Sequence, residues 1–289
     1  MPEGVEVKLS GELIKPLVVG KQIKKVALGD HSRYAGQPPK GFDEFKKSFI
    51  KEGDGLNIID DCKIVDVQVK GKFMYWTFSN GWYMFCTFGM TGQWSPKAGK
   101  HVCYELKLVD YTVPKSEDAH SDVYFNDPRH FGTLQFTNDK KVLSSKLDEL
   151  GWDPLRMDLQ KNLPWLKLQL SKTSKPVGEV MMDQGVFAGV GNYIRAEALY
   201  LSKLSPFRTA KSLNDNEIQK LCQSIIDVME ESYKHQGATI STYKTVYGEE
   251  GKYSGLFKVY GQKQDPLGNK IVKQDSGGRT IHWCPTVQA

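Results

Sequence analysis

The sequence has no paired cysteines, no long apolar run and no internal repeat. Its five cysteines are odd in number and none stands in a Cys-x-x-Cys pair, which argues against a disulfide framework and favours buried thiols. It holds no run of 18 or more apolar residues and no signal-peptide pattern, which argues against a membrane-spanning helix and against secretion. We therefore expect a soluble, intracellular protein that folds without covalent staples.

A strong charge of one sign is also missing. The formal net charge is +5, from 39 Lys and Arg against 34 Asp and Glu, which permits a polyanionic partner without requiring one. With 289 residues, 39% of them hydrophobic, the chain can build one large or two moderate domains with apolar cores.

The hydrophobic pattern changes along the chain. Up to about residue 136 it is typical of strands, with alternation in KIVDVQVKGK and HVCYELKLV and short apolar runs in WYMFCTF, DVYFN and GTLQF. Later segments have helical spacing, and the last forty residues return to strands. We predict a β-rich domain over 1–136, a linker over 137–163, a helical domain over 164–245 and a finger over 246–289.

The chain begins MPEGVE, with a proline second and two carboxylates, Glu3 and Glu6, close behind. Proline at the first helical position and acids in the first turn are ordinary helix-start signals. A chemical interpretation stands beside this one, because removal of Met1 would leave Pro2 with a free, exposed secondary amine. An α-amine titrates near pH ~7.7–8.0, so an uncharged and nucleophilic fraction exists at neutral pH. Glu3 is then a candidate general acid.

The Asn-Gly pair in WTFSNGWYMF predicts a β-hairpin. With a two-residue loop, the register places Lys72 opposite Gly89, so Lys72 and Met90 share one end of the hairpin. Each residue also has a plain interpretation, the lysine as a solvated edge charge and the methionine as a core residue.

The stretch FNDPRHFG places Arg129 and Phe131 in a turn between two apolar runs. Proteins that extrude a base from a duplex need apolar wedges and a guanidinium to occupy the vacated space. Met90, Arg129 and Phe131 supply these side-chain types. A structural turn with a stacked arginine explains the stretch equally well.

Two glycine-rich stretches follow in the second half. The first, QGVFAGVGN, leads into a helix that begins at Asn192, whose free N–H groups suit a phosphate, although a tight turn between helices is the plain alternative. The second, KQDSGGRTIHW, predicts a hairpin that carries Arg279 beside its tip. Only His282 and Cys284 offer metal ligands there, and structural zinc needs four. We expect this finger to fold without metal.

Taken together, MPEGVE, VKGKF, FGMTG, NDPRHFG, AGVGN, and VYGQ followed by GGRT resemble the Fpg/Nei family of DNA glycosylases, in the right order over the whole chain. The resemblance implies an α+β fold: an N-terminal β-sandwich with an N-terminal helix, then a helix-two-turn-helix domain and an antiparallel β-hairpin finger. The missing zinc ligands and the GRTI segment resemble the eukaryotic Nei-like 1 branch, which has a zincless finger.

The resemblance also implies an activity, that of a bifunctional DNA glycosylase and AP lyase of base excision repair. It would remove oxidised pyrimidines, hydantoins and formamidopyrimidines and nick the strand by β,δ-elimination. Pro2 would attack C1′ and form a Schiff base, Glu3 would protonate the sugar ring oxygen, and Lys72 would bind a phosphate near the lesion. The implied DNA-binding residues are Glu6, Met90, Arg129, Phe131, Lys175, Asn192 and Arg279.

Within that DNA-binding set the implied roles differ. Glu6 would support the N-terminal helix. The wedge residues Met90, Arg129 and Phe131 would fill the gap left by the everted nucleotide. The other three would grip the DNA backbone.

The implied partner is double-stranded DNA with an oxidised base or an abasic site, with single-stranded or bubble DNA as a further candidate. No cofactor is implied, and the protein would act as a monomer, in the nucleus if its source is eukaryotic. Two alternatives stay open, an Fpg-type glycosylase that prefers 8-oxoguanine and a non-catalytic nucleic-acid-binding module. The chain departs from the family at Val5, where a second proline is usual, and at His130, where a second arginine is frequent.

Overall fold

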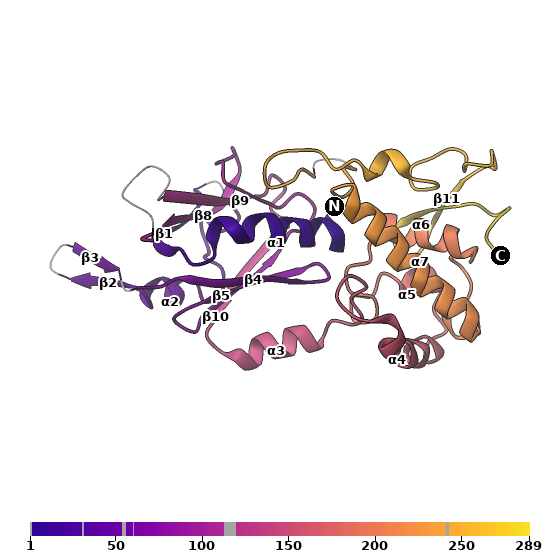
Figure 1. Ribbon diagram of the computed structural model, residues 1–289, viewed down its shortest axis with the longest axis horizontal. Coiled ribbons are helices and arrows are strands. Elements are labelled where there is room, and N and C mark those ends of the chain that lie inside the picture. The colour runs from indigo at the N-terminus through magenta and orange to yellow at the C-terminus, as the bar shows by residue number, and fades with distance from the viewer. Residues whose placement is uncertain (1, 31, 54–55, 60, 113–119, 241–242) are drawn as a thin grey trace. The chain divides into compact units, whose positions relative to one another are not determined.

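The computed structural model describes residues 2–30, 32–53, 56–59, 61–112, 120–240 and 243–289 (Figure 1). The chain divides into two units. The first unit holds Met1–Pro2, Glu6–Lys146 and Thr239–Glu250, and the second holds Glu3–Val5, Leu147–Ala238 and Gly251–Ala289. The domain boundaries drawn from the sequence stay a prediction.

The first unit is a β-sandwich accompanied by helix α1. Its elements are α1 (Gly4–Val18), β1 (Gln22–Leu28), α2 (Phe42–Lys47), β2 (Ile50–Gly53), β3 (Leu56–Ile59), β4 (Ile64–Lys70), β5 (Phe73–Phe78), β6 (Tyr83–Thr87), β7 (Gln93–Ser95), β8 (Val102–Val109), β9 (His120–Asn126) and β10 (Thr133–Thr137). Two antiparallel sheets have the orders β1-β8-β9-β7 and β10-β6-β5-β4, and β2 pairs with β3. This confirms the predicted β-sandwich with an N-terminal helix.

Aromatic side chains fill the space between the two sheets. Trp76 of β5 and Trp94 of β7 are fully buried, and their ring centroids lie 4.6 Å apart. Tyr104 of β8 meets Phe136 of β10 at 5.9 Å. Large rings at alternate strand positions form this core because successive side chains of a strand point to opposite faces.

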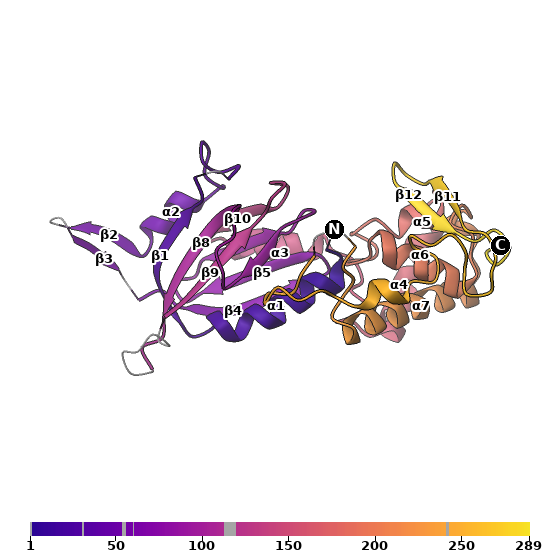
Figure 2. The ribbon, with the colours of Figure 1, turned by 90° about the horizontal axis from the view of Figure 1, so that it is seen from above.

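Helix α1 packs alongside β4, as Figures 1 and 2 show. Lys15 forms an ion pair of 2.6 Å with Asp66 early in β4. One helical turn closer to the N-terminus, a Cβ at Gly11 would lie 2.8 Å from Val69 near the end of β4. Helix and strand therefore run antiparallel, and the start of α1 points toward the sheet end where Lys72 lies.

The Asn-Gly hairpin is confirmed, but its register differs by one residue from the predicted one. Thr77 pairs with Tyr83, and Phe78 N–H donates to the Trp82 carbonyl, so the loop has three residues, 79–81. Gly81 closes it with a φ of 82°, as the third position of such loops requires. Extending this register places Lys72 opposite Phe88 and not Gly89.

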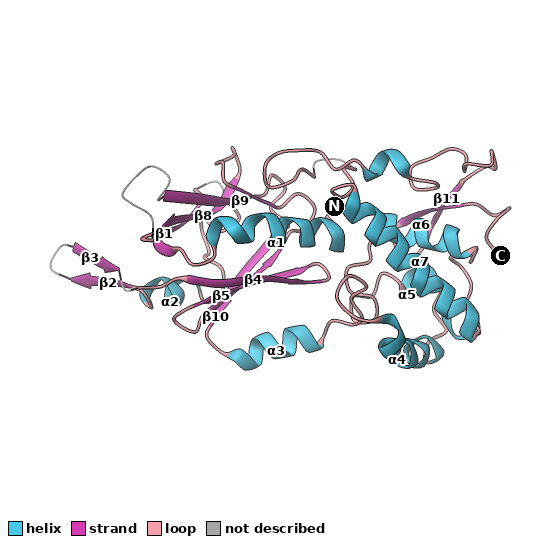
Figure 3. Cartoon of the chain, viewed as in Figure 1, coloured by secondary structure: helices cyan, strands magenta, loops and turns pink. Residues whose placement is uncertain are grey.

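The second unit is helical and ends in the predicted hairpin (Figure 3). It contains α4 (Leu159–Ser171), α5 (Val177–Val180), α6 (Asn192–Ser202), η2 (Ala210–Ser212), α7 (Asp215–Lys234), η3 (Tyr253–Leu256), β11 (Val272–Asp275) and β12 (Thr280–Trp283), while α3 (Lys140–Asp148) crosses the boundary between the units. Within the described part of the chain, no helix has the length and apolar content needed to cross a membrane.

Side-chain caps define where the longer helices begin. Asp158 accepts a hydrogen bond from Lys161 N–H at the start of α4. Asn214 and Glu217 form a reciprocal capping box at the start of α7. Such caps satisfy backbone N–H groups that have no partner within the helix.

Candidate functional site

Glu3 places a carboxylate at the N-terminus of α6. It is 2% exposed, and its two oxygens accept hydrogen bonds from Tyr193 N–H at 2.9 Å and Ile194 N–H at 3.3 Å. These are among the first N–H groups of the helix, where the macrodipole stabilises an anion. The residue directly after Pro2 is therefore fixed in position by helix α6.

Glycine is required on both sides of this contact. A Cβ at Gly191 would lie 2.2 Å from the Glu3 carboxyl carbon, and a Cβ at Gly4 would lie 2.7 Å from Gly189. Gly4 N–H donates to the Gly189 carbonyl at 2.8 Å. The sequence left this helix N-terminus open between a phosphate site and a tight turn between helices. The structure shows that two of its N–H groups donate to Glu3 of the same chain.

Pro2 and Glu6 are both buried. The sequence predicts an exposed Pro2 amine for a chain without Met1, and Met1 lies outside the described residues, so this expectation stays a prediction. Glu6 is 1% exposed, and its charge contributes after burial to raising the pKa of Tyr243. Glu6 thus lies in the interior of the first unit.

Three of the predicted site residues gather at one end of the sheet β10-β6-β5-β4. Thr133, Thr87 and Phe73 form one row across β10, β6 and β5. Lys72 directly precedes that row, and Met90 follows it by three residues. Phe131 precedes Thr133 by two residues, so the sheet register brings Lys72, Met90 and Phe131 to the same end.

Asp127 joins the two loops that carry the wedge residues. It is fully buried and accepts hydrogen bonds from Thr91 Oγ1 at 2.5 Å, Gly132 N–H at 2.6 Å and Arg129 N–H at 3.3 Å. Thr91 belongs to the loop of Met90, and the other two belong to the loop of Phe131. One buried carboxylate therefore holds both loops in one arrangement.

The wedge residues themselves are exposed. Met90 is 37% and Phe131 53% exposed, and the Arg129 guanidinium carbon lies 5.1 Å from the centre of the Phe131 ring. Exposed apolar side chains on loops that a buried carboxylate holds in place are available to an external partner. The sequence left open a structural turn with a stacked arginine. That stacking of Arg129 on Phe131 is present, and the Phe131 side chain is also exposed.

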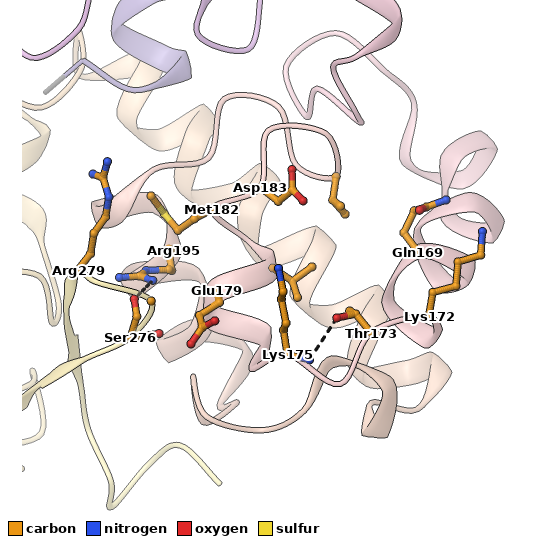
Figure 4. A pocket seen from close by; sticks show the side chains of 13 residues that line it. Gln169, Lys172, Thr173, Lys175, Glu179, Met182, Asp183, Arg195, Ser276 and Arg279 are labelled. Carbon is orange, nitrogen blue, oxygen red and sulfur yellow. Dashed lines mark hydrogen bonds between the residues drawn. The ribbon is translucent and has the colours of Figure 1, made fainter. Parts of the chain in front are cut away.

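In the second unit, Lys175 and Arg279 line one cavity of 410 Å³ (Figure 4). It lies between α5, the C-terminal end of α4 and the hairpin turn. Lys172 and Arg195 add positive charge to the cavity, while Glu179 and Asp183 add carboxylates. The residues that line the cavity are Gln169, Lys172, Thr173, Lys175, Glu179, Val180, Met182, Asp183, Val186, Arg195, Ser276, Gly277 and Arg279. The two predicted backbone-binding cations thus share one surface.

Asn192 is half-buried at the first position of α6, and both ends of its amide are bonded within the second unit. Its Nδ2 donates to the Thr280 carbonyl at 2.9 Å, and its Oδ1 accepts from Arg195 at 2.5 Å. Sequence reasoning missed Arg195 and Asp127, because neither belongs to a pattern of local spacing. Their partners lie up to 81 residues away.

Burial disfavours a cysteine nucleophile. All five are buried free thiols, as predicted. Burial raises the pKa of Cys62 to about 12, of Cys103 to about 11 and of Cys222 to about 12. A protonated thiol is a poor nucleophile at neutral pH.

Comparisons with known proteins identify the family. Residues 1–134 match the formamidopyrimidine-DNA glycosylase N-terminal domain, and residues 150–244 match the formamidopyrimidine-DNA glycosylase H2TH domain. The formamidopyrimidine-DNA glycosylase of Lactiplantibacillus plantarum is 32% identical over 235 residues, which are 78% of this chain and 81% of that protein.

Solved structures agree with these matches. The crystal structure of the MutM (Fpg) protein of Thermus thermophilus superposes with a TM-score of 0.80 at 28% identity, covering 99% of this chain and 98% of that one. A Lactococcus lactis Fpg mutant in complex with a Fapy-dG containing DNA shares the fold, with a TM-score of 0.82 at 23% identity and 99% coverage of both chains. The chain belongs to the formamidopyrimidine-DNA glycosylase family.

Proposed function

We propose that this Fpg-type DNA glycosylase is bifunctional, removing oxidised bases in base excision repair and then cleaving the abasic strand as an AP lyase. The observation that carries the proposal is the buried Glu3 carboxylate, held by two N–H groups of α6 directly after Pro2. A catalytic acid needs a fixed position next to its nucleophile. Pro2 and Glu3 are chain neighbours and meet this need.

In the proposed reaction, removal of Met1 frees the Pro2 nitrogen, which attacks C1′ of the damaged nucleoside as the bond to the base breaks. The Glu3 carboxylate takes the proton that the Pro2 nitrogen releases and passes it to the sugar ring oxygen. The base leaves with the electrons of the broken bond, and the opened sugar forms an iminium with Pro2. The iminium withdraws electrons, which allows β- and then δ-elimination of the flanking phosphates.

Lys72 and the wedge residues have supporting roles in this proposal. A cation at the sheet end beside the wedge can bind a phosphate next to the lesion. Met90, Arg129 and Phe131 would occupy the space that an everted nucleotide leaves, since two are exposed apolar side chains and the third is a guanidinium. Lys175, Asn192 and Arg279 would hold the DNA backbone, and Glu6 would support α1.

We also propose the substrate and the branch. The substrates are duplex DNA with oxidised pyrimidines, hydantoins or formamidopyrimidines, and the Fapy-dG complex of the Lactococcus lactis protein supports the last of these. The finger is assigned to the zincless Nei-like 1 branch. Cys284 supports this, because its Sγ lies 3.7 Å from Asp265 Oδ2 as a hydrogen-bond donor. A chelator is then expected to leave DNA binding unchanged.

Borohydride trapping tests the nucleophile. The enzyme is incubated with a duplex that carries a single oxidised base and reduced during turnover, and the cross-link is mapped by mass spectrometry. DNA is expected on the peptide that begins with Pro2. A form that retains Met1 serves as the matched control and should neither cross-link nor cut, and a cross-link at an internal lysine refutes the assignment.

A panel of lesions in the same duplex separates the alternatives. Faster excision of oxidised pyrimidines and hydantoins than of 8-oxoguanine supports the proposed preference, and the reverse order favours the 8-oxoguanine alternative. Binding without any strand scission favours the non-catalytic module.

A further inference from the structure

The first turn of α6 binds two parts of the second unit at once. Its backbone N–H groups hold Glu3, as described above. Its side chains hold the hairpin, because Asn192 donates to the Thr280 carbonyl at 2.9 Å and Arg195 donates to the Ser276 carbonyl at 3.4 Å. The first turn of α6 therefore holds both Glu3, the residue after Pro2, and the hairpin.

The two anchored carbonyls flank the turn that carries Arg279. Ser276 N–H donates to the Arg279 carbonyl at 2.9 Å and closes the turn. Gly277 and Gly278 have φ values of 65° and 74°, which glycine adopts without strain. The turn of residues 276–279 is thus attached to α6 at Ser276 and at the following residue, Thr280. The exposed Arg279 side chain lies on this turn, directly before Thr280 (Figure 4).

Arg195 is the centre of this arrangement. It is fully buried, although a buried cation is expensive unless it is bonded. Its guanidinium reaches three acceptors on different segments, the Gly178 carbonyl at 3.1 Å, the Ser276 carbonyl at 3.4 Å and Asn192 Oδ1 at 2.5 Å. A planar fork with five donors can do this, and the single ammonium of a lysine does not reproduce the geometry.

The charge of Arg195 persists at neutral pH. Burial lowers its pKa to about 10, the positive charge of Arg279 acts in the same direction, and the Glu3 carboxylate opposes them. The charge of the buried guanidinium therefore interacts with both Glu3 and Arg279, the two groups that it would hold in register.

We propose that Arg195 is a positioning residue, which attaches the hairpin turn to the first turn of α6 so that Arg279 binds the DNA backbone in register with the Glu3 carboxylate. The inference rests on the proposed function, because it assumes that Arg279 binds a phosphate. It adds a residue that does not touch the substrate and acts through one that does.

Salt-dependent DNA binding tests the inference. Affinity for a duplex with a stable abasic analogue is measured over a range of KCl concentrations for wild type, Arg279→Ala, Arg195→Met, Arg195→Lys and the double variant of Arg195→Met with Arg279→Ala. Loss of one phosphate contact reduces the log–log salt slope by about 0.9. Affinity should fall about tenfold, since a hydrogen bond to a charged group is worth about that much.

We expect Arg195→Met to reproduce the affinity loss and the shallower slope of Arg279→Ala, and the double variant to lose no more than Arg279→Ala alone. Arg195→Lys keeps the charge without the fork, so it should also resemble Arg279→Ala. Arg208→Met is the matched control, because the Arg208 guanidinium is bonded to Glu217 on α7 and to the Ser212 carbonyl. Its slope should equal that of wild type.

Three outcomes overturn the inference. They are a wild-type slope in Arg195→Met, additive losses in the double variant, and a wild-type response of Arg195→Lys, which would show that charge alone matters. If Arg195→Met does not fold, Arg195→Lys and its combination with Arg279→Ala decide. Failure of the wild-type enzyme to cut the damaged duplex counts against the proposed function instead, so the two failures are distinguishable.

Discussion

At the scale of single residues, Asp127 is hydrogen-bonded to both loops that carry the wedge residues. Thr91→Val removes the hydroxyl that donates to Asp127 and keeps the side-chain shape. Loss of a hydrogen bond to a buried carboxylate weakens stability by about 1.5–3 kcal/mol. We expect single-turnover excision to fall by about tenfold, because Met90 is no longer fixed beside Phe131.

Thr87→Val is the matched control for this prediction. The Thr87 hydroxyl bonds to Thr133 Oγ1 at 2.6 Å and not to Asp127. It should change the melting temperature without a comparable change in excision. Equal loss of excision in both variants would show that Asp127 has no particular role in holding the two loops.

Gly191 leaves the space that the Glu3 side chain occupies at the N-terminus of α6. In Gly191→Ala, a Cβ placed 2.2 Å from the Glu3 carboxyl carbon would displace that side chain. We expect excision to fall by about 10²-fold, as a displacement near 1 Å can cause, while DNA affinity changes little. Gly255→Ala is the control, because no atom lies within 4 Å of its added Cβ. Unchanged excision in Gly191→Ala would remove Glu3 from the reaction.

Residue types were predictable from the sequence where a motif carried them, and bonding partners were not. The exposure of Phe131 followed from an aromatic residue placed in a turn, whereas Met90 was left open between an exposed and a core position. Asp127 and Arg195 did not, because a carboxylate or a guanidinium becomes important only through groups that folding brings near. The N–H groups of α6 show the same limit, since nothing in the local spacing indicates that Glu3 occupies them.

At the scale of elements, hairpin identity was predictable and register was not. The Asn-Gly pair specifies a tight turn, but distant contacts chose a three-residue loop over a two-residue one. Asn80 Nδ2 donates to Ser48 Oγ, and the Ser79 hydroxyl accepts from Lys63 N–H. Both contacts stabilise the loop from outside the hairpin, so its own residues do not reveal the register.

The finger depends on a hydrogen-bonded carboxylate. Asp265 is 5% exposed and accepts from the backbone N–H groups of Leu267 and Asn269, the Asn269 side chain, the Tyr200 hydroxyl and the Cys284 thiol. Burial opposes ionisation, but the hydrogen bonds from Asn269, Leu267 and Tyr200 outweigh it and lower the pKa of Asp265. This turn and the C-terminal strand of the finger are joined through that charge.

Acid should therefore loosen the finger. The folded-state pKa of Asp265 lies below its unfolded value of about 3.9, so the unfolded chain binds more protons. The stabilisation is present above about pH 5 and is lost as the pH falls through about 3.9 toward the folded-state value. The indole N–H resonance of Trp283 in β12 reports the change by NMR. In Asp265→Asn the finger should already be looser at neutral pH, and the Trp283 resonance should not change between pH 5 and the folded-state pKa of Asp265. An unchanged acid transition in that variant would show that a group other than Asp265 causes the loosening.

At the scale of the whole molecule, the order of strands and helices followed from hydrophobic periodicity, but the path of the chain did not. Residues 239–250 follow the helices in sequence and yet belong to the first unit. Val246 is 1% exposed in the β-sandwich core, and Gln93 Nε2 donates to the Thr245 carbonyl at 2.7 Å. Periodicity reports which face of an element is buried and does not report which core buries it.

This path makes a prediction about cooperativity. Val246→Ala removes two methyl groups from the sandwich core and should destabilise the first unit by about 1.5–3 kcal/mol, although the residue lies after α7 in sequence. Val259→Ala, at a fully buried position of the second unit, is the matched control. Hydrogen exchange followed by mass spectrometry distinguishes them, because local protection reports the stability of the unit that contains each amide. Val246→Ala should speed exchange in β5 and β6 and leave α6 and α7 protected, and Val259→Ala should do the opposite. Equal loss of protection in both units after either substitution would mean that the chain unfolds as one cooperative body, in which a segment's assignment to one core has no separate energetic meaning.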